Sequence, residues 1–338
     1  MTSYMMLLMV TVHAVFFHAM PRLSRRDILF AVTVSEAFES GAGRALVSRY
    51  RTIVWSGAAV ALAAGLLLPV LLPGAGRNGF LMIGVVGGNA LVAINAWVWA
   101  HRKARAHAVA PSAVRVASLV PRDTSLPGGM LLALGPFAIL LATALLIYVT
   151  QESPIAIKPF RQLAFGGVYA ALMLTLAVTM ARRSRQVAVD GPAAVAEQRF
   201  RRVNAIVPVV VAYAAAIMLS LGTLDSIPAF GGALSGRAWL VVLPLMLVNL
   251  GVAFWMIRVG QGGQRAVAPS ARQDIHGDAT PDHAWKIGGL YYVNPRDPAM
   301  WVENRIGLGY TLNLGNWRAW LLMIGMILVP LVAGRLLF

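Results

Sequence analysis

The sequence predicts an all-α integral membrane protein with about eight transmembrane helices and a small cytoplasmic α+β element. Hydrophobic residues make up 58% of its 338 residues and charged residues only 12%, whereas soluble domains average ~45–50% and ~25%. Several apolar runs exceed the ~18 residues needed to cross a bilayer. A soluble enzyme, a disordered chain and a disulfide scaffold are therefore excluded.

Eight apolar runs of spanning length follow one another along the chain. They cover residues 4–20, 52–73, 79–100, 128–150, 163–181, 204–223, 237–257 and 317–337. The first differs from a cleaved signal peptide because no Lys or Arg precedes it and a basic cluster, Arg22, Arg25 and Arg26, follows it. We therefore expect a retained helix whose short N-terminus lies outside the cell.

The basic residues gather in alternate loops. Of the 29 Lys and Arg, 24 lie in segments 21–51, 101–127, 182–203 and 258–318, and five lie elsewhere. Cytoplasmic loops carry the excess of Lys and Arg, so these four segments are predicted to be cytoplasmic and both termini to lie outside. The net charge of +16 then reflects orientation and attraction to anionic lipid headgroups. The alternative is a docking surface for an acidic partner or nucleic acid, and of these two partners direct nucleic-acid binding is not expected.

The chain is predicted to have four parts. Residues 1–258 form a seven-helix membrane bundle that includes the cytoplasmic loop 21–51. Residues 259–281 are rich in Gly, Gln, Ala, Ser and Pro and form a flexible linker. Residues 282–316 form a cytoplasmic tail domain, and 317–338 form the eighth transmembrane helix.

Two cytoplasmic segments have the pattern of folded structure. Residues 28–34 are β-prone and too short to span, and Ser35 after them can cap a short helix that ends at Gly41. In the tail, 289–293 and 310–314 have the pattern of strands and 298–305 that of a short helix. We expect the three strands to pair into one small sheet, because lone strands are marginal in water.

The tail also carries a recognisable motif. It reads Tyr291-Tyr292-Val293-Asn294-Pro295-Arg296-Asp297-Pro298, then Trp301-Val302, Arg305, Gly307, Gly309-Tyr310-Thr311 and Asn313. This pattern resembles the C-terminal tail domain of a bacterial and archaeal membrane-protein family of unknown function, with Val293 as an insertion. Residues 28–51 are similar to the stretch after the first helix of that family, although Ser35 stands where the family has Pro.

The resemblance extends distantly to immunity proteins for a secreted killing factor. In that family the membrane protein protects its own cell and can hold a small repressor at the membrane. The resemblance therefore implies a small cytoplasmic regulator as a partner, and another membrane subunit is the alternative. The tail lies on the predicted cytoplasmic side, where a partner could respond to the state of the bundle, so we also expect it to be a candidate cytoplasmic docking surface. The alternative is that the tail only anchors the eighth helix. The residues of that surface are Trp285, Tyr291, Tyr292, Asn294, Asp297, Trp301, Arg305, Tyr310 and Asn313.

Few polar side chains lie deep in the predicted spans. All 13 Asp and Glu fall in loops or at span edges, whereas proton-coupled carriers usually keep an intramembrane carboxylate. The candidate intramembrane polar site therefore consists of His13, Asn89, Asn95 and Asn249. His13 could relay protons or bind metal, or it could bond a neighbouring helix. The three Asn could join helices or line a substrate cavity.

No catalytic pattern stands out. The chain has no Cys, and it lacks the metalloprotease, nucleophile-elbow, P-loop and dinucleotide motifs. His276, Asp278, Asp282 and His283 are expected to be solvated in a flexible segment rather than to bind metal. We therefore expect no cofactor, no metal site and no catalytic residues.

These observations favour a non-enzymatic protein of the bacterial inner membrane, of the immunity, sensing or small-substrate transport type. One alternative is a membrane-embedded enzyme acting on a lipid or lipid-linked substrate, with loop acids such as Asp27, Asp123 and Asp190 on its cytoplasmic side. The other is an accessory subunit of a larger membrane complex.

Overall fold

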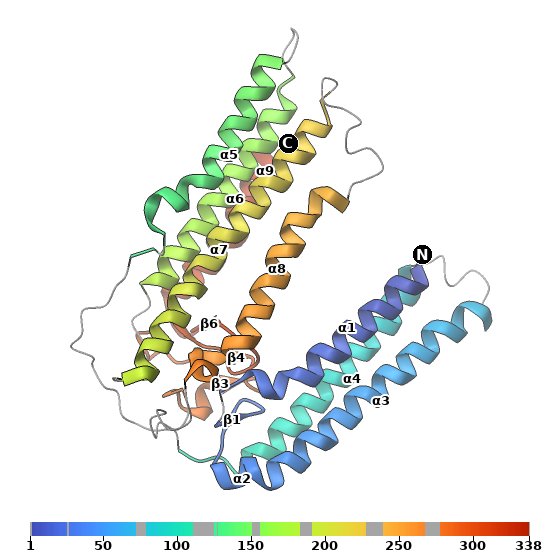
Figure 1. The fold of residues 1–338 in the computed structure, drawn as a ribbon. Helices are drawn as coiled ribbons and strands as arrows, with labels where there is room; N and C mark the ends of the chain where they lie inside the picture. The colour runs from blue at the N-terminus through green and yellow to red at the C-terminus, as the bar shows by residue number, and fades with distance from the viewer. Residues whose placement is uncertain are drawn as a thin grey trace. The chain divides into compact units, whose positions relative to one another are not determined.

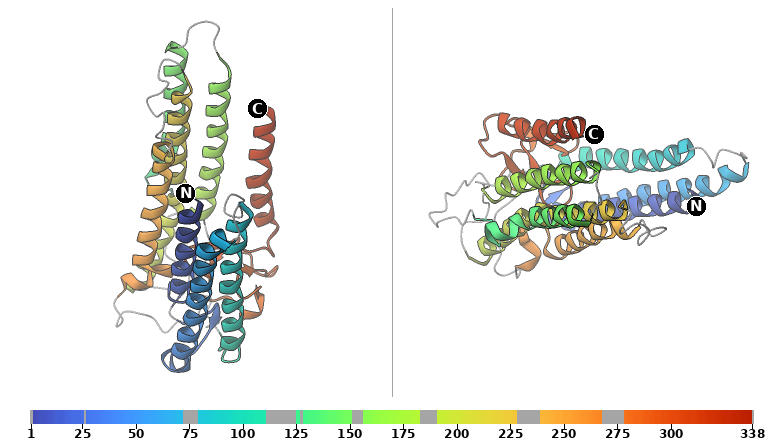
Figure 2. Two further views of the ribbon diagram at one scale, coloured as in Figure 1. Left: turned by 90° about the vertical axis from the view of Figure 1, so that its right-hand side faces the viewer. Right: turned by 90° about the horizontal axis from the view of Figure 1, so that it is seen from above.

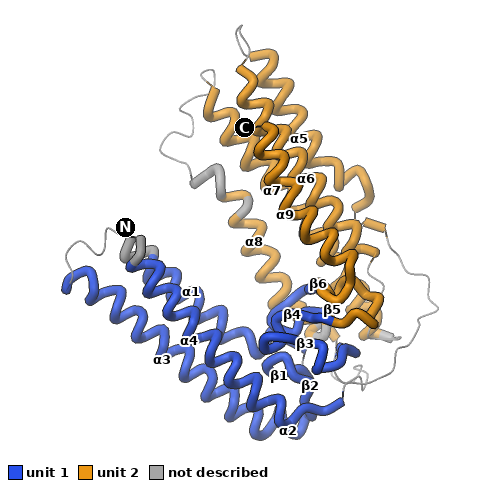
Figure 3. Tube along the Cα trace, turned by 180° about the vertical axis from the view of Figure 1, so that it is seen from behind, with its two compact units in different colours: residues 1–116, 273–293, 303–311 blue, residues 117–272, 294–302, 312–338 orange. Residues whose placement is uncertain are grey.

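Figure 1 shows the computed structural model of the chain, which describes residues 2–25, 27–71, 79–110, 125–126, 128–150, 156–182, 191–227, 239–267 and 278–337. The chain divides into two compact units (Figure 3). Unit 1 contains residues 1–116, 273–293 and 303–311, and unit 2 contains 117–272, 294–302 and 312–338. Residues of the predicted tail domain, 282–316, are thus shared between the two units.

Long helices occur at every range where the sequence predicts a span. They are α1 (Thr2–Leu23), α3 (Ala42–Leu71), α4 (Gly79–Arg105), α5 (Gly129–Thr150), α6 (Lys158–Ala181), α7 (Gly191–Asp225), α8 (Trp239–Val259) and α9 (Trp317–Leu337). Seven of the described helices are long and apolar enough to cross a membrane, as expected of an all-α membrane protein. The predicted number of eight is not matched, because α8 is not among these seven and several of its side chains lie outside the described residues.

Two helices begin well before the predicted spans. Helix α3 starts at Ala42 rather than at 52, and α7 starts at Gly191 rather than at 204. The added turns carry arginines, which are good helix formers but are invisible to a search for apolar runs. Some basic residues that were used to predict orientation lie outside the described residues: Arg26, Arg77, Arg115, Arg122, Arg183, Arg185, Arg237 and Arg272.

Unit 1 is built on helices α1, α3 and α4, which pack on one another (Figure 2). Glycines permit this close packing, because a Cβ at Gly57 would touch Val92 and one at Gly65 would touch Met6. Small residues serve the same purpose in membrane bundles generally. The Tyr50 hydroxyl on α3 also donates a hydrogen bond of 2.9 Å to the Phe17 carbonyl on α1.

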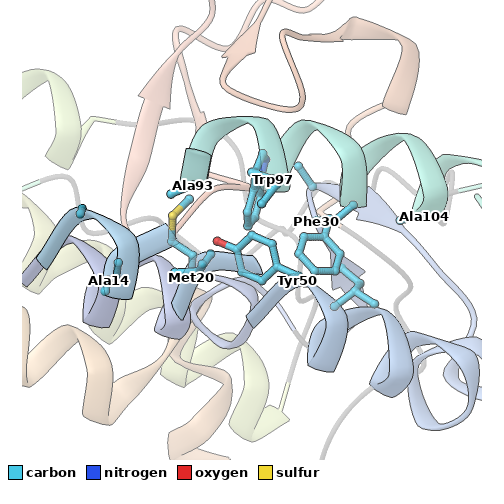
Figure 4. Close-up of a cluster of buried hydrophobic side chains, with 14 of the residues drawn as sticks. Ala14, Met20, Phe30, Tyr50, Ala93, Trp97 and Ala104 are labelled. Carbon is cyan, nitrogen blue, oxygen red and sulfur yellow. The ribbon is translucent and has the colours of Figure 1, made fainter. Parts of the chain in front are cut away.

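The core of unit 1 ends in an aromatic cluster (Figure 4). Phe30 comes from the loop after α1, Tyr50 from α3 and Trp97 from α4, and their ring centroids lie 5.1 to 6.0 Å apart. All three rings are buried and meet edge to face, a geometry that adds ~0.5–1.5 kcal/mol per pair beyond area burial. The cluster therefore fixes the loop after α1 to two helices.

Unit 2 is a helical bundle in which α5, α6 and α7 pack together, α8 packs on α7, and α9 packs on α6. Helix α5 approaches α7 so closely that a Cβ at Gly135 would overlap the Tyr213 ring. Tyr213 instead donates a hydrogen bond of 2.8 Å to the Leu132 carbonyl. A buried hydroxyl pair, Thr143 and Ser220 at 2.9 Å, joins the same two helices, as polar side chains often do inside membrane bundles.

The strands form three separate two-stranded sheets among the described residues. These are β1 (Ile28–Leu29) with β2 (Val32–Thr33), β3 (Trp285–Lys286) with β4 (Tyr291–Tyr292), and β5 (Trp301–Glu303) with β6 (Tyr310–Leu312). The prediction of one sheet from 28–34, 289–293 and 310–314 was therefore wrong. The helix predicted at 298–305 was also wrong, because Trp301–Glu303 is extended and pairs with β6.

The short helix of the first loop was predicted correctly. Helix α2 covers Glu36–Ser40, the Ser35 side chain accepts from the Phe38 amide, and Gly41 follows the last turn. The start of the predicted linker is instead ordered, since residues Gln261–Ala266 form the 3₁₀ segment η2 and Gln261 is buried. Residues 268–277 of the linker lie outside the described residues.

Candidate functional site

A buried polar cluster in unit 1 joins the loop after α1 to the tail. Its centre is Arg305, and its other members are Thr33, Asp278, Thr280 and Asp282, together called the Arg305 cluster. The guanidinium donates from Nε to Asp278 at 3.0 Å, from Nη1 to Asp282 at 2.5 Å, and from Nη2 to Asp278 at 2.9 Å. The contact with Asp278 is thus bidentate, which is the strongest form of an Arg–carboxylate pair.

Loop and tail are bound together at the same point. Nη1 of Arg305 also donates to the Ala31 carbonyl at 3.0 Å, and the Asp282 carboxylate accepts from the Thr33 hydroxyl at 3.0 Å. The Arg305 carbonyl in turn accepts from the Ser24 hydroxyl at 2.7 Å. Residues more than 240 positions apart in sequence therefore share one hydrogen-bonded network.

The charges of the cluster are well compensated. Arg305 and Asp278 are 0% and 1% exposed. Burial alone would raise the pKa of Asp278, but the adjacent Arg305 charge and bonds from Arg305 and Thr280 lower the pKa below its usual value. Burial would lower the pKa of Arg305, but Asp278 and Asp282 raise it. Both groups therefore stay charged, and breaking such a buried pair typically costs ~3–5 kcal/mol.

Aromatic and ionic contacts surround the cluster. The guanidinium carbon of Arg305 lies 5.2 Å from the centroid of the Trp285 ring, and the Trp285 indole donates to Thr280 at 2.8 Å. A second buried ion pair, Arg25 with Glu303 at 3.0 Å, again joins the loop after α1 to the tail. A cation over a desolvated aromatic ring adds ~2 kcal/mol, so the cluster is a fixed structural joint.

The turn that presents the Ala31 carbonyl is strained. Phe30 and Ala31 connect β1 to β2 with φ values of 50° and 64°, a conformation that two-residue hairpins usually give to Asn and Gly. Neither residue is exposed, and the Phe30 carbonyl lies 2.8 Å from Nδ1 of His101 on α4. The aromatic cluster and this bond hold the turn in place, so helix positions in unit 1 are linked to the Arg305 cluster.

A second buried network organises the part of the tail that belongs to unit 2. Asn313 is 0% exposed, and its Nδ2 donates to the carbonyls of Asn294, Asp297 and Ala299 at 2.9, 3.0 and 3.2 Å. Its Oδ1 accepts from the amides of Asn294 and Gly315, both at 3.0 Å. One amide side chain thus supplies the hydrogen bonds that a regular sheet would otherwise provide.

The predicted docking surface is corrected by these contacts. Most of its members are buried, namely Trp285, Tyr292, Asp297, Trp301, Arg305 and Asn313, while Asn294 and Tyr310 are partly buried. Only Tyr291 is exposed, at 42%. Buried side chains cannot contact a partner directly, so these residues stabilise the tail and any docking surface must be formed by their neighbours.

The four predicted intramembrane polar residues are divided between the two units, with His13, Asn89 and Asn95 in unit 1 and Asn249 in unit 2. Asn89 is buried on α4, with its Nδ2 3.5 Å from the Val10 carbonyl on α1. Nδ1 of His13 lies 2.8 Å from the Met9 carbonyl of its own helix, and Asn95 donates to Leu91 on its own helix. Asn249 is exposed on α8 in unit 2. Asn89 therefore fits the interhelical role that the sequence left open.

Sequence reasoning missed the acidic half of the Arg305 cluster. Asp278 and Asp282 were expected to be solvated in a flexible segment, but Asp278 is fully buried and Asp282 is bonded to Arg305. His276 lies outside the described residues. No sequence pattern marked these acids, because the segment is a turn in which Ala279 has a φ of 57° and the Asp278 carboxylate accepts from the Thr280 amide at 3.0 Å. Among the residues that the structure describes, no group of three or more His, Asp or Glu side chains could hold a metal ion.

Comparison with known proteins gives one short match. The model of a family of unknown function, DUF5808, matches residues 295–320. No curated protein and no solved structure matches the chain. The matched segment includes Arg305 and Asn313 but not Asp278 or Asp282, so it covers one side of the Arg305 cluster and most of the Asn313 network.

Proposed function

We propose that this protein is a non-enzymatic, multi-pass protein of the bacterial cytoplasmic membrane that acts as a sensor. In this proposal α8 is the eighth span, the basic segments face the cytoplasm and both termini lie outside. The charge distribution of the loops supports this orientation. Immunity and small-substrate transport are the other functions that the sequence allows for such a protein.

The Arg305 cluster is the observation that carries the proposal. It binds the loop after α1 to the tail, and the same loop packs against α3 and α4 through Phe30 and bonds His101 on α4. A shift of α1, α3 or α4 in the membrane would therefore move the part of the tail that belongs to unit 1 with it. A rigid joint of this kind is what a sensor needs to convey a change in its helices to a cytoplasmic partner.

The state of the acids in the cluster supports a role without catalysis. Asp278 accepts from Arg305 and Thr280, and Asp282 accepts from Arg305 and Thr33. A general acid or base must exchange a proton with its substrate, whereas the oxygens of Asp278 and Asp282 accept hydrogen bonds from donors of the chain itself. The partner of the tail would be a small cytoplasmic regulator or another membrane subunit.

The proposal is tested by complementing a gene-deletion strain with R305M and comparing its transcripts with those of the wild type. We expect R305M to insert in the membrane and to reproduce the transcript changes of the deletion. N304D serves as the control, since an Asp at 304 keeps the oxygen that accepts from the Ile306 amide, and it should restore the wild-type profile. If the R305M protein is degraded in the cell, the D282N variant is used for the same comparison of transcripts.

Two results would overturn the proposal. The first is a stable R305M or D282N protein with a wild-type transcript profile. The second is turnover of lipid or lipid-linked sugar by the purified protein in nanodiscs, followed by mass spectrometry of the lipids, which would favour the membrane-enzyme alternative.

A further inference from the structure

The turn between β3 and β4 carries three large side chains that face away from unit 1. Ile287 is 69% exposed, Leu290 is 44% exposed and Tyr291 is 42% exposed. The neighbouring Trp285 and Tyr292 point into the core and are 5% and 0% exposed. The apolar residues therefore form a small exposed tip, residues 287–291, on an otherwise well-packed hairpin.

The tip lies against the membrane helix α4. The Trp97 indole donates a hydrogen bond of 3.0 Å to the Gly288 carbonyl, and a Cβ at Gly288 would lie 3.6 Å from Trp97 and 3.8 Å from Val98. Trp97 precedes Arg102, the first basic residue of the last turn of α4, by five positions. At ~1.5 Å of rise per residue, Trp97 lies about 7.5 Å along the axis of α4 from that basic residue, toward the apolar part of the helix.

The backbone of the tip suits an apolar setting. The amides of Gly289 and Leu290 both donate to the Lys286 carbonyl, at 3.1 and 3.0 Å, and the Gly288 carbonyl is taken by Trp97. Irregular backbone at membrane depth requires such internal partners, because hydrocarbon offers none. The hairpin therefore satisfies part of the backbone of its turn within the chain.

The conformation of Ile287 also points to a role for its side chain. Ile287 has a φ of 49°, a left-handed conformation that a β-branched residue rarely adopts. Strain of this kind is retained where the surroundings or a ligand make use of the residue. In water an exposed Ile in this conformation has no benefit, whereas in lipid its exposed surface is removed from water.

We propose that the β3–β4 tip inserts into the cytoplasmic interface of the bilayer beside α4, and that lipid is its binding partner. Ile287 and Leu290 contact acyl chains, and Tyr291 lies at the headgroup level, where aromatic side chains concentrate. Lys286 and the basic residues Arg102, Lys103 and Arg105 of α4 favour anionic headgroups. Lipid is the favoured occupant because the tip adjoins α4, a helix of spanning length whose large apolar side chains Leu91 and Ile94 are exposed.

The absence of Cys from the chain makes a depth measurement direct. Single-cysteine variants I287C, I94C and H283C carry an environment-sensitive fluorophore in vesicles of phosphatidylcholine and phosphatidylglycerol. I94C reports the lipid-facing surface of α4, and H283C reports an exposed position beside the Arg305 cluster. Quenching by nitroxide-labelled lipids is compared with quenching by aqueous iodide.

We expect I287C to behave like I94C, with blue-shifted emission, strong quenching by lipid nitroxides and severalfold weaker quenching by iodide than H283C. L290C repeats the measurement if I287C does not fold. Emission and iodide quenching equal to those of H283C at both positions would overturn the proposal and make the tip a surface for a protein partner. The vesicles contain no other protein, so this outcome is independent of the sensing proposal.

Discussion

Arg305 and Asn313 are single buried polar residues that each hold several chain segments together. Arg305 does so with a charge that two carboxylates balance, and Asn313 does so with a neutral amide that bonds five backbone groups. An unpaired buried polar group is costly, so both residues should be sensitive to changes that preserve their shape.

Replacing Asn313 with Asp tests the amide network at constant volume. N313D places a carboxylate oxygen against the carbonyls of Asn294, Asp297 and Ala299, so we expect a loss of about 3 kcal/mol of stability. N304D is the matched control, because its oxygen still accepts from the Ile306 amide. The apparent melting temperature in detergent, read by size-exclusion chromatography after heating, should fall for N313D and stay near wild type for N304D. Equal melting temperatures would contradict the role of Asn313.

The Asp278–Arg305 pair should stabilise the protein at neutral pH and lose this contribution at low pH. The folded-state pKa of Asp278 is lowered, so its contribution is fully present above the unfolded-state pKa of ~3.9 and is lost as pH falls through the folded-state pKa. The melting-temperature gap between wild type and D278N should therefore be constant from neutral to mildly acidic pH and should narrow only below about pH 4. A difference in melting temperature that disappears near pH 6 would contradict the lowered pKa of Asp278.

The motif around these residues could be recognised from sequence, but their burial could not. Arg305 and Asn313 stood out in the tail pattern, yet an Arg is usually exposed, and its partners Thr33 and Asp278 are remote in sequence or in a Gly- and Pro-rich segment. Burial of a charge depends on partners that only the fold brings together. The acids were therefore predicted to be solvated and the tail residues to form a surface.

At the scale of elements, the hairpin turns determine how the loop and the tail meet. Gly289 has a φ of 90°, and a Cβ there would overlap the Cβ of Ala31. The turn of β3–β4 thus packs backbone to backbone on the turn of β1–β2. This contact explains why β1–β2 and β3–β4 remain separate hairpins, since the two hairpins meet through their turns and not through the edges of their strands.

Replacing Gly289 with Ala tests this close approach. We expect G289A to lower stability by roughly 2–4 kcal/mol, from left-handed strain and overlap together. G307A is the control, because Gly307 has a φ of 89° but no atom within 4 Å of an added Cβ, so only the strain of ~1–2 kcal/mol applies. The double variant G289A/A31G should recover part of the loss in melting temperature. If G289A and G307A lose equal stability, the turns do not touch.

Elements with long apolar runs were predictable and short strands were not. All predicted spans coincide with helices, since about twenty apolar residues leave few alternatives. The pairing of strands failed because the turn at Phe30 and Ala31 contains none of the Gly, Asn or Asp that usually mark a hairpin. The surrounding aromatic rings, not the local sequence, hold this turn in place.

At the scale of the whole molecule, the proposed topology depends on which side of the membrane carries the basic segments. Reporter fusions after Arg105, Arg185 and Arg265 are all expected to report the cytoplasm, because 24 of the 29 Lys and Arg lie in the segments that contain these positions. Fusion at Arg265 also tests α8 as a span. A periplasmic signal from any of the three would break the alternation and contradict the proposed topology.

The central claim is that the loop after α1 and the unit 1 part of the tail form one rigid module joined by Arg305. Spin labels at E36C and H283C, two exposed positions in unit 1, allow double electron–electron resonance on protein in nanodiscs. The account predicts a narrow distance distribution in the wild-type background and a broad one in R305M. A distribution that is already broad in the wild-type background, or one that R305M leaves unchanged, would contradict it.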